Sequence, residues 1–437
     1  MIAILSLAAV IGFTPATAHR IDAIVAAELR AHRAPGVAVG VVESGRLVYA
    51  RGFGTASLSR RVVVSPGTQF GIGQISVQFT AAAILLLAQD GKLKLDDTVT
   101  QYLPEVTIAR YVTIRELLDQ TSGLPNVTNW AHLLASANAA RPMATPGASY
   151  APNPLNAILA GKIVERVAGE PLSDYVQQHI FVPLVMDATL YEGDTGLSPN
   201  RAVGYTRENG RFERARPWSA TRLDGNAGIV SDVYDLAKWD IAFPILLRVD
   251  AVREMFTPGI AGSYERRGMG WAIDRRSGRR FVWQNGEIPG FHAMNAVLPD
   301  EHVAVIVLTN VDSMHEAALL PESIAGRILD IVVPPSRQRI ENGVVERARE
   351  WLARLASDRI DRTQLTSGFS AYLSDDVVRR AQIDRLGRVE SLVPISSAPA
   401  QHGTTTYEFL VRFANGERHY RLTLTPDGKI DFISFTP

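Results

Sequence analysis

Residues Thr68 to Leu95 read TQFGIGQISVQFTAAAILLLAQDGKLKL, and this stretch predicts how the rest of the chain is organised. Phe79 to Leu87 is almost wholly apolar, which exceeds the single apolar stripe of a surface helix, so we expect a buried helix here. Asp90-Gly91 should end it, because glycine readily adopts the left-handed conformation of a helix C-terminus. Gly71-Ile72-Gly73 allows another backbone to approach closely at the N-terminal end, where helices often present a nucleophile or bind an anion.

The flanking segments predict an α+β fold, in which helices flank an antiparallel sheet and a helical region is inserted. The Val-rich run Gly36–Val42 before Ser44-Gly45 and the run Leu47–Gly52 after it predict a hairpin with a glycine turn. Apolar periodicity predicts helices at Arg20–Arg33, Thr113–Asp119, Leu155–Val167, Leu172–Ile180, Val233–Phe243 and Glu316–Ile331. Strand-like runs at Met269–Arg275, Arg280–Trp283 and Phe291–Asn310 should complete the sheet that the hairpin begins.

The chain divides into four predicted segments. Residues 1–18 are apolar and end in Ala16-Thr17-Ala18, which is typical of a signal peptide, so we expect an exported protein, periplasmic or secreted. Residues 19–333 form the main domain, and Pro334-Pro335 opens a linker at 334–340. Residues 341–437 predict a small helix-plus-antiparallel-sheet domain, with a helix at Glu341–Leu355 and strands at Thr405–Phe413, His419–Thr425 and Ile430–Phe435. No motif in it suggests chemistry, so we expect a packing or interaction role.

Composition excludes several classes of function. The net charge is zero, which gives no reason to expect nucleic acid as a partner. The chain has no cysteine, and its nine histidines show no metal-ligand spacing, so we expect neither a metal nor a cofactor. Beyond residues 1–18 no apolar run reaches 18 residues, so no stable membrane span is expected after removal of the signal.

The opening stretch resembles a known family. The β-lactamase-related serine hydrolases, in their class C-like, esterase and D-Ala-D-Ala-carboxypeptidase branch with its penicillin-binding-protein relatives, read roughly F-x-I-G-S-x-x-K-x-F-T-A…G-K-L-x-L-D-D here. The matching residues are Phe70, Ile72, Gly73, Phe79, Thr80, Ala81, Gly91, Lys92, Leu93, Leu95, Asp96 and Asp97. The family's nucleophile motif is S-x-x-K, but Gln74 stands in its Ser position and Val77 in its Lys position. No lysine elsewhere in the chain follows a serine by three residues.

The resemblance places two further elements, and both are changed. Counting back from Gly161, the Tyr and Asn positions of the family's Tyr-x-Asn hold Pro152 and Pro154, with Tyr150 and Asn153 nearby as a substitute pair. In the segment Trp283–Phe291, Gln284 stands where the family has His or Lys, followed by Asn285 and the retained Gly286. Gly286 should let this strand pass close to a ligand.

These changes predict a hydrolase fold without acyl-serine chemistry. Neither glutamine, valine nor proline can act as a general base near neutral pH. We therefore expect a pseudoenzyme that binds a peptide, a cell-wall fragment or a protein partner in the old cleft, through Gln74, Ser76, Tyr150, Asn153, Gln284, Asn285, Gly286 and His292. Two alternatives stay open. One is an active hydrolase using relocated groups such as Tyr150 or His292 with a water, and the other is an interaction protein acting through residues 341–437.

Overall fold

The structure is a computed structural model that describes most of the chain from residue 12 to residue 436. Outside the described part lie residues 1–11, 32, 128–131, 192–199, 217–224, 261–265, 313–319, 336–339, 358, 374–385, 401–402, 415 and 437. Most of the predicted signal peptide and linker are therefore not described. The chain forms two compact units: a large unit of residues 22–274 and 281–321, and a small unit of residues up to 21, 275–280 and from 322 onward.

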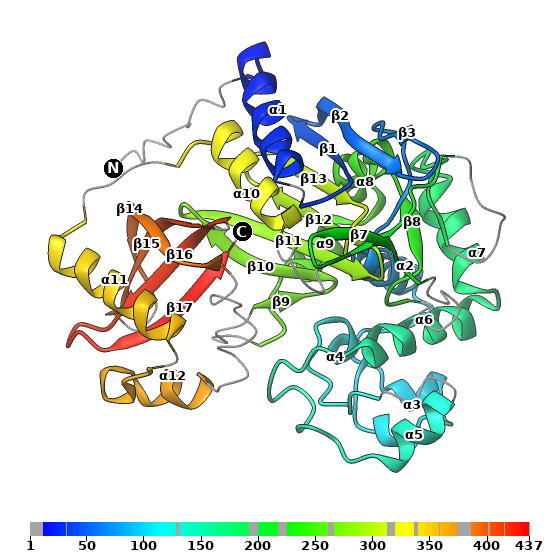
Figure 1. The fold of residues 1–437 in the computed structure, drawn as a ribbon. Coiled ribbons are helices and arrows are strands. Elements are labelled where there is room, and N and C mark those ends of the chain that lie inside the picture. Colours follow the sequence, from blue (N-terminus) through cyan, green and yellow to red (C-terminus); the bar gives the residue numbers. More distant parts are fainter. Residues whose placement is uncertain are drawn as a thin grey trace, which may run out of the picture. The chain divides into compact units, whose positions relative to one another are not determined.

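An eight-stranded sheet is the centre of the fold (Figure 1), in the order β3-β2-β1-β13-β12-β11-β10-β9. Its strands are β1 (Gly36–Glu43), β2 (Arg46–Ser57), β3 (Val62–Val63), β9 (Arg267–Gly268), β10 (Trp271–Arg276), β11 (Arg279–Ile288), β12 (Phe291–Leu298) and β13 (Val303–Thr309). The predicted hairpin is confirmed as β1 and β2, and Ser44 and Gly45 take positive φ in its turn. Every residue of β1, β12 and β13 is buried.

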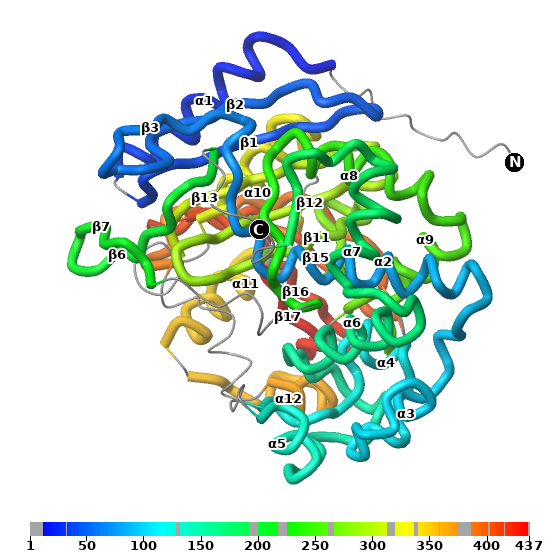
Figure 2. The backbone as a smooth tube through the Cα atoms, turned by 90° about the vertical axis from the view of Figure 1, so that its right-hand side faces the viewer, coloured from blue at the N-terminus to red at the C-terminus, as the bar shows by residue number. Residues whose placement is uncertain are grey.

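Helix α2 (Ser76–Gln89) is the buried helix that the opening stretch predicts. Apart from Leu86, Ala88 and Gln89 all its residues are buried, and Gly91 follows it with φ of 70°. It packs against α6 (Pro154–Ala168) and α7 (Leu172–Val176), as Figure 2 shows. On the sheet, α8 (Val233–Leu246) contacts β1 and β13.

The inserted helical region holds short helices, and capping residues in the sequence determine where some of them begin and end. Its other elements are α3 (Val99–Tyr102), α4 (Ile114–Leu118), α5 (Leu133–Ala139), the π-turn Gln177–Phe181 that continues α7, and α9 (Val249–Met255) after α8. Thr113 and Glu116 form a reciprocal capping box at the start of α4. Pro154 starts α6, where its missing N–H costs nothing, and Gly169 ends it in the left-handed conformation.

Two small sheets complete the large unit. One orders β4 (Phe70–Gly71), β8 (Ile229–Ser231) and β5 (Leu190–Tyr191), and the other pairs β6 (Tyr205–Glu208) with β7 (Arg211–Arg214). Through β4 the chain enters the 3-10 turn η1 (Gly73–Ile75), which leads directly into α2. None of the described helices is long and apolar enough to cross a bilayer.

The small unit pairs helices with a four-stranded antiparallel sheet. It holds most of α10 (Leu320–Val332), α11 (Asn342–Ala356), α12 (Ser367–Tyr372), β14 (Val389–Pro399), β15 (Thr405–Phe413), β16 (Gly416–Leu424) and β17 (Ile430–Thr436). The predicted helix and three strands are present, and β14 is an additional edge strand. Helix α10 belongs to this unit by its contacts, although it precedes the boundary predicted at 334–340.

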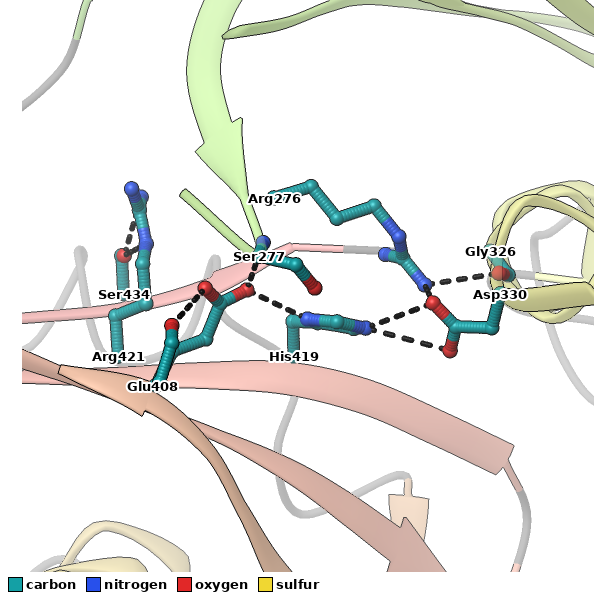
Figure 3. A network of polar contacts seen from close by, with 9 residues as sticks. Arg276, Ser277, Gly326, Asp330, Glu408, His419, Arg421 and Ser434 are labelled. Carbon is teal, nitrogen blue, oxygen red and sulfur yellow. Dashed lines mark hydrogen bonds and ion pairs between the residues drawn. The ribbon is translucent and has the colours of Figure 1, made fainter. Parts of the chain in front are cut away.

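A buried polar network joins three segments of the small unit (Figure 3). His419 on β16 places Nδ1 2.6 Å from Oε1 of Glu408 on β15 and Nε2 3.2 Å from Oδ1 of Asp330 on α10. Asp330 also pairs with Arg276 at 2.9 Å, and Glu408 accepts the backbone N–H of Ser277 at 2.7 Å. The network thus connects residues that lie more than 140 positions apart in the sequence.

Three element boundaries differ from the predicted ones. The first helix, α1, runs from Pro15 to Arg30 and so begins before the predicted cleavage site. Helix α8 continues through Pro244 and ends at Leu246, so the proline lies in its last turn. Strand β11 extends to Ile288, five residues beyond the predicted run. Gln284 to Ile288 pair with β12 although they are polar or glycine at four positions.

Candidate binding cleft

All five altered positions line one cavity of about 270 Å³ in the large unit. They come from three segments: Gln74 and Val77 from η1 and the first turn of α2, Pro152 and Pro154 from the start of α6, and Gln284 from β11. The full lining is Gln74, Val77, Leu118, Gln120, Tyr150, Pro152, Asn153, Pro154, Asn226, Arg267, Gly268, Gly270, Trp271 and Gln284. Gln74 and Val77 lie three residues apart, which brings both to the same face of the turn.

Two glycines bring the start of α2 against strand β11. A Cβ on Gly73, whose φ is 53°, would lie 2.3 Å from the backbone nitrogen of Glu287. A Cβ on Gly286 would lie 1.8 Å from the carbonyl oxygen of Ile72. The close approach predicted from these glycines is therefore between two backbone segments of the protein. Gly286 itself is packed against Ile72, and it does not line the cavity.

The Gln74 side chain spans this junction. Its Oε1 accepts a hydrogen bond of 2.8 Å from the backbone N–H of Glu287 on β11. No described residue accepts a hydrogen bond from its Nε2, and Gln74 lines the cavity. Gln284, also half-buried in the lining, donates from Nε2 to the carbonyl of Asn285 at 2.9 Å.

Of the other predicted cleft residues, Tyr150 and Asn153 lie in the lining. Asn153 is buried, and its Nδ2 donates to the carbonyl of Leu124 while its backbone N–H donates to Gln120 Oε1. These bonds hold the segment before α6 against the loop around residue 120. Tyr150 is half-buried, and its ring contacts the Arg267 guanidinium, whose carbon lies 5.2 Å from the ring centroid.

Ser76, Asn285 and His292 lie outside the lining, contrary to their predicted place in the cleft. Ser76 is fully buried, and its Oγ accepts from the backbone N–H groups of Gly228 and Ile229 at 3.3 and 3.2 Å. It therefore secures α2 to the start of β8. His292 is 3% exposed, and β12 pairs it with Thr309 of β13 inside the sheet.

Sequence reasoning missed Gln120, Asn226, Arg267 and Trp271. Among the described residues of the lining, Arg267 is the one with a formal charge, since the others are apolar, aromatic or carry neutral amides. Its position on β9 follows from the segment Arg267-Gly-Met-Gly-Trp271, in which Gly268 and Gly270 allow close packing on Met255 and Gln78. In the sequence, the two glycines that follow Arg267, Gly268 and Gly270, were the signal from which its place in the lining could have been predicted.

Close to the lining, Asp119 lies between Leu118 and Gln120 and is 3% exposed. Burial raises its pKa to about 6, although the Thr121 hydroxyl donates to it. In the part of the chain that the structure describes, no three acidic or histidine side chains are arranged to hold a metal ion.

Comparison with known proteins settles the family. The model of the Beta-lactamase family matches residues 21–326, well over half of the chain. The chain belongs to the beta-lactamase family. The putative penicillin-binding protein PbpX of Bacillus subtilis (strain 168) is 27% identical over 280 residues, covering 62% of this chain and 70% of that protein.

Solved structures of beta-lactamase-like proteins have a fold similar to that of this chain. The octameric penicillin-binding protein homologue from Pyrococcus abyssi matches with a TM-score of 0.65 at 18% identity, covering 96% of this chain and 99% of that one. A class C beta-lactamase matches with a TM-score of 0.63 at 20% identity, covering 72% and 96%. The α+β fold expected from the sequence is thereby confirmed.

Proposed function

We propose that this beta-lactamase-family protein binds its ligand non-covalently in the cleft and forms no acyl-serine. One observation carries the proposal: the side chain in the family's nucleophile position uses its own carbonyl oxygen to accept the Glu287 N–H. Acyl transfer needs backbone N–H groups that are free to stabilise an oxyanion next to the nucleophile. Here such a donor, 2.8 Å from Gln74 Oε1, is already paired.

Gln74 has the covalent skeleton of an acylated serine. Its Cγ stands where a serine has Oγ, its Cδ corresponds to the acyl carbon, and Oε1 corresponds to the acyl oxygen. Unlike an acyl-serine it contains no ester bond, so no water can hydrolyse it in a catalytic cycle. Around residue 74, the cleft therefore resembles an acyl-enzyme whose nucleophile already carries its acyl group.

No neighbouring group in the altered positions can move a proton. Val77, Pro152 and Pro154 carry no titratable side chain, and Gln284 has only a neutral amide. Removing one member of a catalytic unit costs about as much as removing all of it, often about 10⁴- to 10⁶-fold in turnover. Acyl-serine turnover by this set should be undetectable.

The groups that remain suit polar recognition. Gln74 Nε2 offers a donor without a described acceptor, and Gln120 and Gln284 add further amide groups to the lining. Ligand sites commonly combine apolar walls with a few fixed polar groups, and Trp271 and Leu118 supply such walls. A short peptide, a cell-wall fragment or a loop of a partner protein fits this chemistry.

The experiment is incubation with a fluorescent penicillin and, separately, with a fluorophosphonate. We expect no stoichiometric labelling of the natural protein by either reagent. The double variant Gln74→Ser/Val77→Lys, which restores S-x-x-K, serves as the matched comparison, and any labelling of it should map to residue 74. Stoichiometric labelling of the natural protein would refute the proposal.

A hydrolase with relocated groups is less well supported. His292 lies outside the lining, and Tyr150 faces the Arg267 guanidinium. Turnover of p-nitrophenyl acetate or nitrocefin that His292→Ala abolishes would nevertheless establish this alternative in place of the first.

We also propose that the protein is exported, because residues 1–18 are apolar and small residues precede His19. A mature N-terminus at His19 in protein recovered from outside the cytoplasm is the expected result.

For residues 341–437 we propose a packing or interaction role. The test is whether a partner protein that is pulled down with the full chain is lost when surface residues of β14 are changed.

A further inference from the structure

A second cavity, of about 580 Å³, lies in the inserted helical region of the large unit. Its walls are α6 from Ile158 onward, the segment that follows α3, and the start of α5, and we call it the α6 cavity. It shares no lining residue with the cleft, although α6 contributes to both, through Pro154 in the cleft and Ile158 one turn further along. Its volume is typical of small-molecule sites.

Much of the lining of the α6 cavity is apolar. Leu103, Val106 and Leu159 are buried side chains that line it, and they come from two different segments. Leu134, on α5, also lines it and is 39% exposed, so the fold leaves this large apolar side chain in contact with water. A ligand with an apolar body would displace that water, which favours binding.

Both cations of the lining are already paired with carboxylates of the same lining. Lys162 Nζ lies 2.8 Å from Glu165 Oε2, and Arg166 Nη2 lies 3.1 Å from Glu105 Oε1. Glu165 also accepts the backbone N–H of Leu172 through its other oxygen. These two pairs leave neither a spare cation for an anionic ligand nor a spare charge on the two carboxylates.

Glu170 is the third carboxylate of the lining, and its side chain is only 28% exposed. Its Oε2 accepts a hydrogen bond of 3.1 Å from Gln178 Nε2, a neutral donor. Its Oε1 lies 3.9 Å from Nε2 of His179, which forms an ion pair with it only when the imidazole is protonated. Among the described residues no lysine or arginine pairs with Glu170, so the lining holds one more carboxylate than cations.

The end of α6 adds negative potential to the same cavity. The helix ends at Ala168, and Gly169, which lines the cavity, caps it by donating its N–H to the Glu165 carbonyl. The last carbonyls of a helix have no partner within it, and the aligned peptide dipoles place a partial negative charge there. Glu170 follows directly, so its carboxylate and the helix terminus both favour a cation.

We infer that the α6 cavity binds a cationic amphiphile, a molecule with an apolar body and one ammonium group. The body lies against Leu103, Val106 and Leu159, and the ammonium pairs with Glu170 at the end of α6. An ammonium group is a compact cation with hydrogen-bond donors only, which matches a carboxylate next to helix carbonyls. This site is separate from the cleft, and the inference does not depend on the function proposed for the cleft.

The test compares two probes that differ only in the head group, 4-(4-fluorophenyl)butan-1-amine and 4-(4-fluorophenyl)butan-1-ol. Each is titrated into the full-length protein at neutral pH, and its dissociation constant is measured by ¹⁹F NMR. Glu170→Gln removes the charge, and its matched control is Asp174→Asn, at an exposed carboxylate on α7 outside the lining. Leu134→Gln makes the apolar wall polar, and its control is Leu58→Gln, at a leucine that is 41% exposed outside the lining.

We expect the natural protein to bind the amine about fivefold or more tightly than the alcohol, as for a partly exposed charged pair. Glu170→Gln should bring the two constants together, whereas Asp174→Asn should keep the difference. Added salt should reduce the preference for the amine, because it screens the charges. Leu134→Gln should weaken the binding of both probes by about two- to fivefold through lost apolar contact, and Leu58→Gln should weaken neither.

Equal binding of the amine and the alcohol by the natural protein would overturn the inference, and so would a preference for the amine that persists in Glu170→Gln. Unchanged binding of both probes by Leu134→Gln would show that the apolar body lies elsewhere and would also overturn it. The absence of saturable binding of the amine in the millimolar range has the same consequence. All four substituted side chains are exposed or half-buried, and circular dichroism verifies that each variant is folded.

Discussion

His419 places Nδ1 2.6 Å from Oε1 of Glu408, and both side chains are buried in the small unit. On the other side of the ring, Nε2 lies 3.2 and 3.3 Å from the two oxygens of Asp330 (Figure 3). Only the protonated ring can donate from both nitrogens. Burial opposes ionisation of Glu408, but the hydrogen bond from His419 and its charge outweigh this and lower the pKa of the carboxyl.

Replacing His419 by Asn should therefore destabilise the small unit severely. Two buried carboxylates would lose a charged donor, and breaking a buried ion pair typically costs about 3–5 kcal/mol. Urea unfolding followed by circular dichroism measures the loss. Arg412→Gln is the control, because Arg412 is 63% exposed in its pair with Glu417, and such a pair contributes at most about 1 kcal/mol. Equal losses in the two variants would contradict the assigned role.

Asp240 should make the large unit less stable as the pH rises. Burial raises its pKa to about 7, although Asn295 Nδ2 donates to it at 2.8 Å. Because the pKa in the folded state is higher than the ordinary aspartate pKa of 3.8, the neutral acid favours folding. That contribution is complete below about pH 4 and is lost as the pH rises through about 7.

Asp240→Asn replaces the neutral acid by an uncharged isostere and should remove this pH dependence. We expect the variant to gain about 2 kcal/mol or more over the natural protein at about pH 8 and to match it at about pH 4. Urea midpoints at the two pH values provide the measurement. A natural protein that becomes more stable than the variant with rising pH would disprove the assignment.

Gly286→Ala should lose about 3 kcal/mol or more, because its Cβ would lie 1.8 Å from the Ile72 carbonyl oxygen and backbone must move. Gly91→Ala is the control, since Gly91 has φ of 70° but open space around it and should lose only about 1 kcal/mol. Thermal unfolding of both variants separates steric overlap from backbone strain. A smaller loss in Gly286→Ala than in Gly91→Ala would show that the two segments can separate freely.

Ser76→Ala should cost about 1–3 kcal/mol, because two buried backbone N–H groups, of Gly228 and Ile229, lose their acceptor. Ser173→Ala, at an exposed hydroxyl beside Asp174, should change stability by less than about 0.5 kcal/mol. Fluorophosphonate treatment should leave the unfolding curve of the natural protein unchanged. A Ser76→Ala variant as stable as the natural protein would remove the structural role given to this serine.

Short sequence patterns correctly predicted the helices and strands that depend on neighbouring residues in the chain. The apolar run in α2 and the glycine after it predicted that helix, and alternation with turn residues predicted the hairpin and three strands of the small unit. Strand β14 was missed because Pro394 and Pro399 interrupt its pattern. Prolines are tolerated there since the strand lies at a sheet edge, with a register shift between Pro394 and Ser396.

The candidate site was predicted as far as motif spacing allows. The positions of Gln74, Pro152 and Gln284 followed from the family pattern, and all three line the cavity. The Gln74–Glu287 hydrogen bond joins residues 213 positions apart and depends on the path of β11 past η1, which no local pattern contains. Arg267 escaped notice because arginines are common in this chain, and only the fold distinguishes the one that faces the cleft.

The turn at residues 275–280 belongs to the small unit although it lies between two strands of the large sheet. The chain therefore passes between the units four times, and no single continuous stretch of the sequence contains the whole small unit. A gene fusion that replaced everything after residue 334 would leave Arg276, Ser277 and Asp330 behind without Glu408 and His419. Exchange of this C-terminal part among relatives would thus require compensating changes far upstream, which ties the history of the two units together.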